Sequence, residues 1–300
     1  MRILITGPSS FSGSFFIEAL SKAGHEVVTT LTKTQSCYHG IRLQRLQKSM
    51  QYATVHEQIC FGDEQFIELV HRESFDVFCH HGAWTESYNS MNYDFEKAFA
   101  NNTRSMNRVC QILAANGCQK IIVSGSIFAE CEEPFSPYGL GKKLTAETTK
   151  FCGTHFGMHV SRFVIPNPFG PLDNPKLISN LLTAWQKKQT PTVYISPYIR
   201  DNIPIDLLAL GFTDWVERCP QTVGDSVFRP SGYVSTMGDF ILRVQQESRV
   251  RTLWACNVDW LAQTDFLQPM KLVNDVPLMK LFPSWNEQGF WDALIEQHVF

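Results

Sequence analysis

The first thirteen residues, MRILITGPSSFSG, carry the feature that most restricts the fold of this chain. Arg2 to Thr6 is a short apolar run typical of a buried strand, and Phe15 to Lys22 has the spacing of an amphipathic helix. Between them, Gly7 permits a tight turn and Gly13 allows the helix to pack closely on the sheet. Such a strand–turn–helix directs backbone N–H groups and the helix N-terminus toward a pyrophosphate. Ser10 stands where the usual glycine pattern has its middle glycine.

Strand-like and helix-like segments alternate through the first half of the chain. Further strands are expected at Gly24–Leu31, Ile59–Asp63, Phe75–Ala83 and Ile121–Val123, with a long helical region at Tyr93–Ala115. This order predicts an α/β protein with a doubly wound parallel sheet, a Rossmann fold. The alternation fades from Pro166 onward, where prolines punctuate the loops. We therefore expect a dinucleotide-binding domain at residues 1–165. Residues 166–300 are expected to form mainly a smaller substrate-binding domain, with segments that return to the Rossmann sheet.

A pair of reactive side chains, Tyr138 and Lys142, follows the strand predicted at 121–123. Their spacing of four residues, on a helix that begins near Pro137, places both on one face. A phenol titrates near pH 10, and an ammonium about 4 Å away is worth roughly 4 kcal/mol at an effective dielectric constant near 20. Lys142 is therefore expected to lower the pKa of Tyr138 by about three units, to near 7. With Ser126 holding a substrate oxygen, these residues suit proton transfer to or from an alcohol or ketone.

Composition and charge narrow the possible partners. The formal net charge of −3 over 300 residues predicts no binding to nucleic acid or to an anionic membrane. No apolar run of about 18 residues appears, and the N-terminus lacks the features of a signal peptide. The nine cysteines are scattered without a Cys-x-x-Cys pair, which favours reduced thiols and a cytoplasmic location. His80 and His81 are adjacent and would point to opposite faces of a strand, so no metal site is expected.

The end of the second predicted strand bears on the choice of dinucleotide. Folds that prefer NAD usually carry an acid there, which binds the ribose 2′-OH. Here the sequence is Thr30-Leu31-Thr32-Lys33, which contains no acid. Lys33 is placed to meet a 2′-phosphate instead, so NADP is favoured over NAD.

Together these segments resemble the extended short-chain dehydrogenase/reductase family of nucleotide-sugar epimerases, dehydratases and reductases. Thr6-Gly7-x-x-Ser10-Phe11-x-Gly13 is similar to its TGxxGFxG, and Asp76–Ala83 (DVFCHHGA) to its DVVIHLAA strand. Further similarities, which extend the resemblance to about residue 203, are Asn101–Asn107 with NVxGTxN, Val123–Ser126 with its SSS strand, Ser136–Lys142 with SPYxxSK, Arg162–Pro171 with LRYFNVYGP, and Arg200–Ile203 with RDFI.

The resemblance implies a role for each matching residue. Tyr138 would be the acid/base, Lys142 would depress its pKa and anchor a ribose, and Ser126 would contact the substrate oxygen. The residues implied at the cofactor are Gly7, Ser10, Phe11 and Gly13 at the pyrophosphate, Asp63 at the adenine, and Ala83, Asn101 and Lys142 along the groove. Asn167 and Arg200 would bind the diphosphate of a nucleotide-linked sugar, Arg200 through charge-assisted hydrogen bonds. The resemblance also implies a homodimer.

The activity implied is hydride transfer at a sugar carbon, taken as C4, of a nucleotide-linked sugar. An NADPH-dependent 4-keto-sugar reductase is preferred because the second strand lacks its acid. The alternative is an NAD-dependent 4-epimerase. A non-catalytic NADP-sensing protein is less favoured, because such proteins usually lack the Tyr/Lys pair. Neither the sugar nor the nucleotide base is specified by the sequence.

Acidic residues near the predicted site receive no chemical role. Nucleotide-sugar 4,6-dehydratases carry an Asp-Glu pair directly after the active-site hydroxyl residue, whereas Ile127 and Phe128 stand there in this chain. Dehydration is therefore not expected. Glu130, Glu132 and Glu133 are expected to form an exposed acidic loop.

Overall fold

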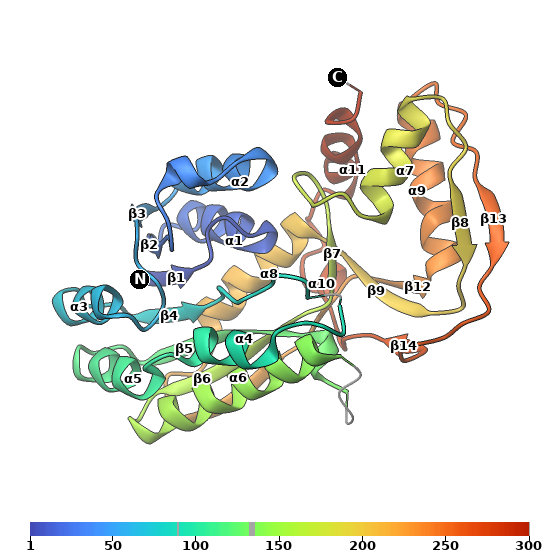
Figure 1. Cartoon of the computed structure of the whole chain (residues 1–300). Helices are drawn as coiled ribbons and strands as arrows, with labels where there is room; N and C mark the ends of the chain where they lie inside the picture. The colour runs from blue at the N-terminus through green and yellow to red at the C-terminus, as the bar shows by residue number, and fades with distance from the viewer. Residues whose placement is uncertain (89, 132–135, 300) are drawn as a thin grey trace. The chain divides into compact units, whose positions relative to one another are not determined.

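The computed structural model of the chain describes residues 1–88, 90–131 and 136–299 (Figure 1). The chain divides into two compact units. Residues 1–165 and 209–229 form the first unit, and residues 166–208 and 230–300 form the second. Helix α8 (Ile205–Arg218) begins in the second unit and ends in the first.

The first unit is built on a seven-stranded sheet with the strand order β10-β6-β5-β4-β1-β2-β3. All neighbouring strands are parallel. The strands are β1 (Arg2–Thr6), β2 (Glu26–Thr30), β3 (Thr54–His56), β4 (Val77–His80), β5 (Lys120–Ser126), β6 (His159–Ile165) and β10 (Gly224–Phe228). The helices that connect them are α1 (Phe11–Lys22), η1 (Gln35–Cys37), α2 (Gly40–Met50), α3 (Glu64–Arg72), α4 (Phe95–Thr103), α5 (Met106–Ala115), η2 (Ile127–Ala129) and α6 (Pro137–His155). The predicted doubly wound parallel sheet is confirmed.

Both faces of this sheet are covered by apolar contacts with helices. On one face, Phe16 of α1 stacks on Phe212 of α8 with ring centroids 4.0 Å apart, and Phe163 of β6 meets Phe212 edge-on at 5.0 Å. On the other face, Ile121 and Val123 of β5 belong to a buried cluster with residues of α3, α5 and α6. Because side chains alternate along a strand, Ile122 of β5, which lies between Ile121 and Val123, faces the opposite side of the sheet, toward α1 and α8.

The third strand lies earlier in the chain than the sequence predicted. Residues Ile59–Asp63 form a turn, and the strand is β3 (Thr54–His56). The Ile59 N–H still donates to the Leu31 carbonyl at 2.8 Å. However, positive φ angles at Gln58 (+61°) and Gly62 (+71°) lead the backbone away from the sheet and toward α3.

The long helix predicted at Tyr93–Ala115 is divided into α4 and α5. The break occurs at Ser105, which adopts a left-handed φ of +51°. A Cβ on Gly62 would lie 1.9 Å from the Arg104 carbonyl oxygen, so the turn before α3 packs directly on this break. A helical pattern in sequence does not reveal such a break, because it depends on a contact with a distant segment.

The second unit contains short strands and peripheral helices. Its elements are β7 (Asn167–Phe169), α7 (Leu177–Gln186), β8 (Thr192–Ile195), β9 (Ile199–Pro204), β11 (Pro230–Ser231), β12 (Tyr233–Thr236), α9 (Met237–Arg251), β13 (Asp259–Ala262), β14 (Lys271–Leu272), β15 (Val276–Pro277), α10 (Leu278–Leu281) and α11 (Glu287–Glu296). Strand β9 pairs with β7, β12 and β14. In the part of the chain that the structure describes, no helix is long and apolar enough to cross a membrane.

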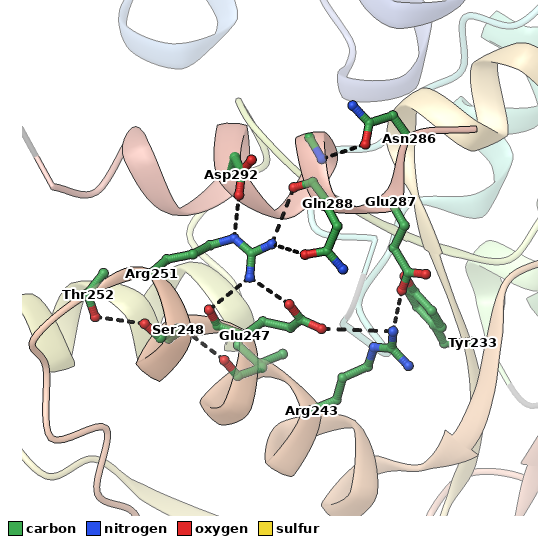
Figure 2. Close-up of polar contacts among 12 residues, drawn as sticks. Tyr233, Arg243, Glu247, Ser248, Arg251, Thr252, Asn286, Glu287, Gln288 and Asp292 are labelled. Carbon is green, nitrogen blue, oxygen red and sulfur yellow. Dashed lines mark hydrogen bonds and ion pairs between the residues drawn. The ribbon is translucent and has the colours of Figure 1, made fainter. Parts of the chain in front are cut away.

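A network of charged side chains joins α9 to α11 in the second unit (Figure 2). Arg251 pairs with Glu247 of its own helix at 2.7 Å and with Asp292 of α11 at 2.6 Å. Arg243 pairs with Glu287, which also accepts the Tyr233 hydroxyl. The arginines each bridge two acids, so the network orients the two helices more strongly than isolated surface pairs would.

Candidate functional site

The Gly7–Gly13 turn joins β1 to α1, and close contacts leave no room for a side chain at either glycine. Gly7 has a φ of +84°, and a Cβ there would lie 2.9 Å from Gly82 Cα. A Cβ on Gly13 would lie 2.3 Å from the Gly7 carbonyl oxygen. Ser10 is the N-cap of α1, since its Oγ accepts the Gly13 N–H at 3.0 Å and donates to the Gly7 carbonyl at 2.8 Å. The serine therefore completes the turn rather than obstructing it.

Phe11 contributes to the turn through its backbone. Its ring is buried, meets Phe15 edge-on at 5.8 Å, and has the Arg45 guanidinium 5.4 Å from its centroid. The side chain is committed to packing. The pyrophosphate contact of Phe11 stays a prediction, and the group suited to it is the backbone N–H, because an N–H in the first turn of a helix has no partner within the helix.

The end of β4 is tied to the end of β1. Thr6 Oγ1 accepts the N–H of Gly82 at 2.8 Å and that of His81 at 3.1 Å. Ala83 follows in a half-buried position as the chain leaves the strand. Because β1 and β4 are adjacent and parallel, the glycine turn and Ala83 lie at the same edge of the sheet, where α/β proteins bind their ligands.

The asparagine that contacts the end of β4 and the residues after it is Asn102, next to the predicted Asn101. Asn101 is exposed, and its amide donates to the Lys97 carbonyl of its own helix at 2.8 Å. Asn102 is buried; its Oδ1 accepts the Trp84 N–H at 2.9 Å and its carbonyl accepts from His80 Nε2 at 2.8 Å. This placement favours Asn102 for the groove role assigned to Asn101. Two consecutive asparagines offer no sequence signal that distinguishes them.

Two residues, Lys33 and Asp63, were predicted to bind the adenosine half of the dinucleotide, and their surroundings differ from each other. Lys33 is exposed just beyond β2. Asp63 is the N-cap of α3: its Oδ1 accepts the Phe66 N–H at 2.8 Å, and its Oδ2 accepts the Cys60 N–H at 2.9 Å. The carboxylate thus stabilises the turn before α3, and its contact with adenine stays a prediction.

A basic residue that the sequence reasoning missed lies at the glycine turn. Arg42 of α2 donates from Nη2 to Ser9 Oγ at 3.2 Å, and its guanidinium lies 5.4 Å from the centroid of the Tyr38 ring. Ser49 of the same helix donates to the Pro8 carbonyl at 2.8 Å. Helix α2 therefore packs on the turn and holds a cation beside it. The basic composition of residues 37–53 was the only signal for this arrangement.

Ser126 is the last residue of β5, and its Oγ accepts the Phe128 N–H at 3.3 Å. A Cβ on Gly139 would lie 2.4 Å from the Phe128 carbonyl oxygen. The first turn of α6 therefore packs directly on η2, the short helix that follows Ser126. This close approach places the helix with Tyr138 and Lys142 beside the end of β5.

Tyr138 is surrounded by aromatic rings. The centroid of Tyr88 lies 5.3 Å from that of Tyr138, and the centroid of Tyr93 lies 5.9 Å away. Burial raises the pKa of Tyr138 above its ordinary value, and the two neighbouring phenols raise it further. The prediction that Lys142 brings this pKa near 7 is wrong for the chain by itself, because the cost of desolvating the phenolate dominates.

Lys142 is a buried cation at the centre of the site, with 6% of its surface exposed. Desolvation lowers its pKa to about 8. Its ammonium also lowers the pKa values of His80 and His81. Within residues 1–88, 90–131 and 136–299, no hydrogen bond or ion pair to the ammonium is found. A buried ammonium without an acceptor is costly, so this position is suited to ligand oxygens.

Glu130, on the segment between η2 and α6, forms ion pairs. One carboxylate oxygen lies 2.8 Å from Arg229 Nη2, and the other lies 3.5 Å from Arg162 Nη2. The expectation of an exposed loop is therefore wrong for Glu130, whose side chain is only 16% exposed. Glu132 and Glu133 lie outside the described residues.

The two predicted diphosphate-binding residues belong to the second unit, and both have protein partners there. Asn167 Nδ2 donates to Asn202 Oδ1 at 2.5 Å. Arg200 is buried, and its Nη1 donates to the carbonyls of Ile199 at 3.0 Å and Pro269 at 3.1 Å. Arg200 thus holds the segment near Pro269 against β9. The diphosphate contacts stay predictions.

The first unit gathers most of the predicted residues at one edge of its sheet, at the carboxyl ends of β1, β4 and β5 and on the helix after β5. These are Gly7, Ser10, Phe11, Gly13, Ala83, Ser126, Tyr138 and Lys142. The arrangement combines a turn suited to phosphates, a largely buried cation with no acceptor among the described residues, a hydroxyl at the end of β5 and a phenol in the first turn of α6. Together these groups can bind a dinucleotide and exchange a proton with an oxygen.

Comparison with known proteins gives the following matches. The model of the NAD dependent epimerase/dehydratase family matches residues 3–200. The structure of UDP-glucuronic acid 4-epimerase from Bacillus cereus, in complex with UDP-glucuronic acid and NAD, aligns with a TM-score of 0.75 at 17% identity, covering 99% of both chains. UDP-glucose 4-epimerase from Thermotoga maritima, with UDP-glucose, aligns with a TM-score of 0.74 at 16% identity, covering 99% of this chain and 98% of the other. The dTDP-glucose 4,6-dehydratase from Streptomyces venezuelae aligns with a TM-score of 0.71 at 17% identity, covering 99% and 96%. No curated protein matches in sequence.

Proposed function

Because the chain belongs to the NAD dependent epimerase/dehydratase family of enzymes, we propose that it transfers a hydride at C4 of a nucleotide-linked sugar, as a 4-keto-sugar reductase. The observation that carries this proposal is the grouping of Ser126, Tyr138 and Lys142 beside the glycine turn. In the extended short-chain dehydrogenase/reductase family these residue types exchange a proton with a substrate oxygen.

The turn and its surroundings fit a dinucleotide. Gly13 has no room for a side chain, because its missing Cβ lets the Gly7 carbonyl and the Ser10 hydroxyl close the turn against α1. Gly7, Ser10, Phe11 and Gly13 would hold the phosphates, and Lys142 would gain ribose hydroxyls as the acceptors that it lacks among the described residues. When bound, the nicotinamide supplies or accepts the hydride.

The residues of the chain would handle the proton. Ser126 would hold the substrate oxygen by a hydrogen bond. Tyr138 would give a proton to that oxygen, and its raised pKa keeps the phenol protonated at neutral pH. A protonated phenol is the form that reduction of a ketone requires.

The preference for NADP rests on two basic residues. Lys33 follows β2 without a neighbouring acid, and Arg42 lies at the glycine turn through its bond to Ser9. Both would be available to a 2′-phosphate. The second candidate is an NAD-dependent 4-epimerase, favoured by the likeness to 4-epimerases with bound NAD. A non-catalytic sensor is disfavoured, because the catalytic side chains are present.

We also propose a cytoplasmic homodimer formed through α6. Phe151 on this helix is 73% exposed and Leu144 is 37% exposed, so the helix that carries Tyr138 presents an apolar surface. Light scattering coupled to size exclusion should give twice the mass of 34.2 kDa, and Phe151→Glu should shift the protein toward monomer. A monomeric wild type would refute the dimer without affecting the catalytic proposal.

The direct test is Tyr138→Phe, assayed with NADPH and 4-keto derivatives of UDP- and dTDP-linked hexoses. Turnover should fall by about 10²- to 10⁴-fold, since the proton donor is lost while dinucleotide binding persists. The matched control is Tyr52→Phe, at a tyrosine that packs under the Lys22 ammonium, and it should retain activity. Unchanged turnover in Tyr138→Phe would refute the acid/base role. Tightly held NAD with interconversion of UDP-sugars, and no net oxidation of NADPH, would identify the epimerase instead.

A further inference from the structure

A buried imidazole lies in contact with the glycine turn. Nε2 of His81 is 3.0 Å from Ser10 Oγ and 3.2 Å from Ser12 Oγ. Nδ1 of the same ring is 2.7 Å from Ser124 Oγ on β5. His81 therefore connects the turn between β1 and α1 with the strand that ends in Ser126. In the strand pattern that this chain resembles, DVVIHLAA, a leucine occupies the position of His81.

The imidazole is neutral at physiological pH. Burial, with smaller contributions from the nearby Lys142 ammonium and from His80, lowers the pKa of His81 to about 3. A neutral imidazole has one nitrogen that donates a hydrogen bond and one that accepts. Which nitrogen carries the hydrogen can be deduced from the surrounding hydroxyl groups.

The Ser10 hydroxyl decides the tautomer. Its single hydrogen is donated to the Gly7 carbonyl at 2.8 Å, and its oxygen already accepts the Gly13 N–H. Only a ring hydrogen on Nε2 satisfies the Gly7 and His81 contacts of Ser10 at the same time, so we place the hydrogen of the ring on Nε2. Nδ1 is then the acceptor, and the Ser124 hydroxyl donates to it. The polar groups of Ser10, His81 and Ser124 then all have complementary partners.

When the donors and acceptors are assigned in this way, one hydroxyl hydrogen is left without an acceptor among the described residues. Ser12, in the first turn of α1, shares the Nε2–H as an acceptor, and its own hydrogen has no acceptor among residues 1–88, 90–131 and 136–299. Ser12 is half-buried, so water has only partial access to its hydroxyl. The end of α1 that carries Ser12 is also the end suited to anions.

We propose that His81 is a positioning residue that fixes the Ser10 turn to β5 and orients the Ser12 hydroxyl as an additional hydrogen-bond donor to the dinucleotide phosphates. This proposal rests on the dinucleotide binding proposed above. Ser124 and Ser126 are two residues apart on β5 and face the same side of the sheet. The imidazole thus holds the phosphate turn in register with the strand of the catalytic hydroxyl.

The binding test compares four variants by titration calorimetry with NAD and with NADP. Ser12→Ala should weaken binding about 10-fold or more, because a hydrogen bond to a charged group is lost. Ser12→Thr, which keeps the hydroxyl, should restore binding. His81→Leu should weaken binding at least as much as Ser12→Ala. Ser14→Ala is the control, because this hydroxyl is bonded back to the Phe11 carbonyl at 3.0 Å, and it should bind like the wild type.

A second measurement does not depend on ligand. In ¹⁵N NMR spectra of the protein without dinucleotide, His81 should show the neutral Nε2–H tautomer. A neutral Nδ1–H tautomer would overturn the assignment of the hydroxyl hydrogens, and a charged ring would overturn the burial argument. A wild type that binds neither dinucleotide would refute the proposed function. Wild-type binding that is unchanged in Ser12→Ala would instead refute the inference and leave the proposed function standing.

Discussion

The burial of His81 makes the folded protein sensitive to acid, and the size of the effect follows from the pKa shift. The folded pKa is about 3 against an ordinary value of 6.5. The folded state therefore binds fewer protons than the unfolded state between these values. Because unfolding takes up a proton there, the contribution of His81 to stability is fully present above pH 6.5 and is lost as the pH decreases toward 3.

The perturbation is His81→Leu, which removes this one titration and keeps the site apolar. Between pH 7 and pH 5, protonation of an unfolded histidine costs the wild type about 2 kcal/mol of unfolding free energy that the variant does not lose. This number depends only on the folded pKa being well below 5. The variant should therefore gain about 2 kcal/mol relative to the wild type over this pH interval, whatever its relative stability at pH 7.

Urea unfolding at both pH values, followed by far-ultraviolet circular dichroism and tryptophan fluorescence, measures the effect. The carboxylates and His80, which titrate in both proteins, cancel in the difference. Phe16→Leu is a suitable control, because Phe16 packs edge-on against His81 at 5.1 Å and carries no titrating group. Its effect on stability should be the same at both pH values. If His81→Leu and wild type gave parallel pH curves, the imidazole would not be sealed from water, and the reasoning would be refuted.

Two further substitutions test the geometry of the glycine turn and the choice of dinucleotide. Gly13→Ala should abolish measurable dinucleotide binding in calorimetry, because its Cβ would collide with the Gly7 carbonyl oxygen at 2.3 Å; binding within a few-fold of wild type would show that the turn can open. Arg42→Ala and Lys33→Ala should each weaken NADP binding more than NAD binding, since each removes a cation suited to the 2′-phosphate, and equal losses for the two dinucleotides would remove the argument for NADP.

The order of strands and helices was predictable from sequence wherever the pattern is local. The apolar run at Arg2–Thr6, the glycine turn and the start of α6 near Pro137 lie where they were expected. The third strand was misplaced because Ile59–Asp63 has the composition of a strand, whereas the positive φ at Gln58 removes it from the sheet. A left-handed glutamine carries no compositional signal.

The side-chain environment was less predictable than the backbone. The spacing of Tyr138 and Lys142 correctly indicated a shared helix, but it says nothing about the rings of Tyr88 and Tyr93 that pack against the phenol ring. Their positions depend on the segment after β4, which lies far away in sequence. Helical spacing therefore identified the two groups but not the direction of the pKa shift.

Ser10 shows why a motif is best judged together with its surroundings. Taken alone, serine in place of a glycine suggests a weakened phosphate turn. In the structure its hydroxyl caps α1 through Gly13 and meets the ring of His81, which itself replaces the leucine of the family-like strand. Each departure supplies the hydrogen-bond partner that the other requires, because a leucine at position 81 could not bond to Ser10. Reverting either position alone should therefore cost more in dinucleotide affinity than reverting both, and Ser10→Gly, His81→Leu and the double variant form the thermodynamic cycle that measures this coupling. Additive losses in the cycle would mean that the two substitutions are independent.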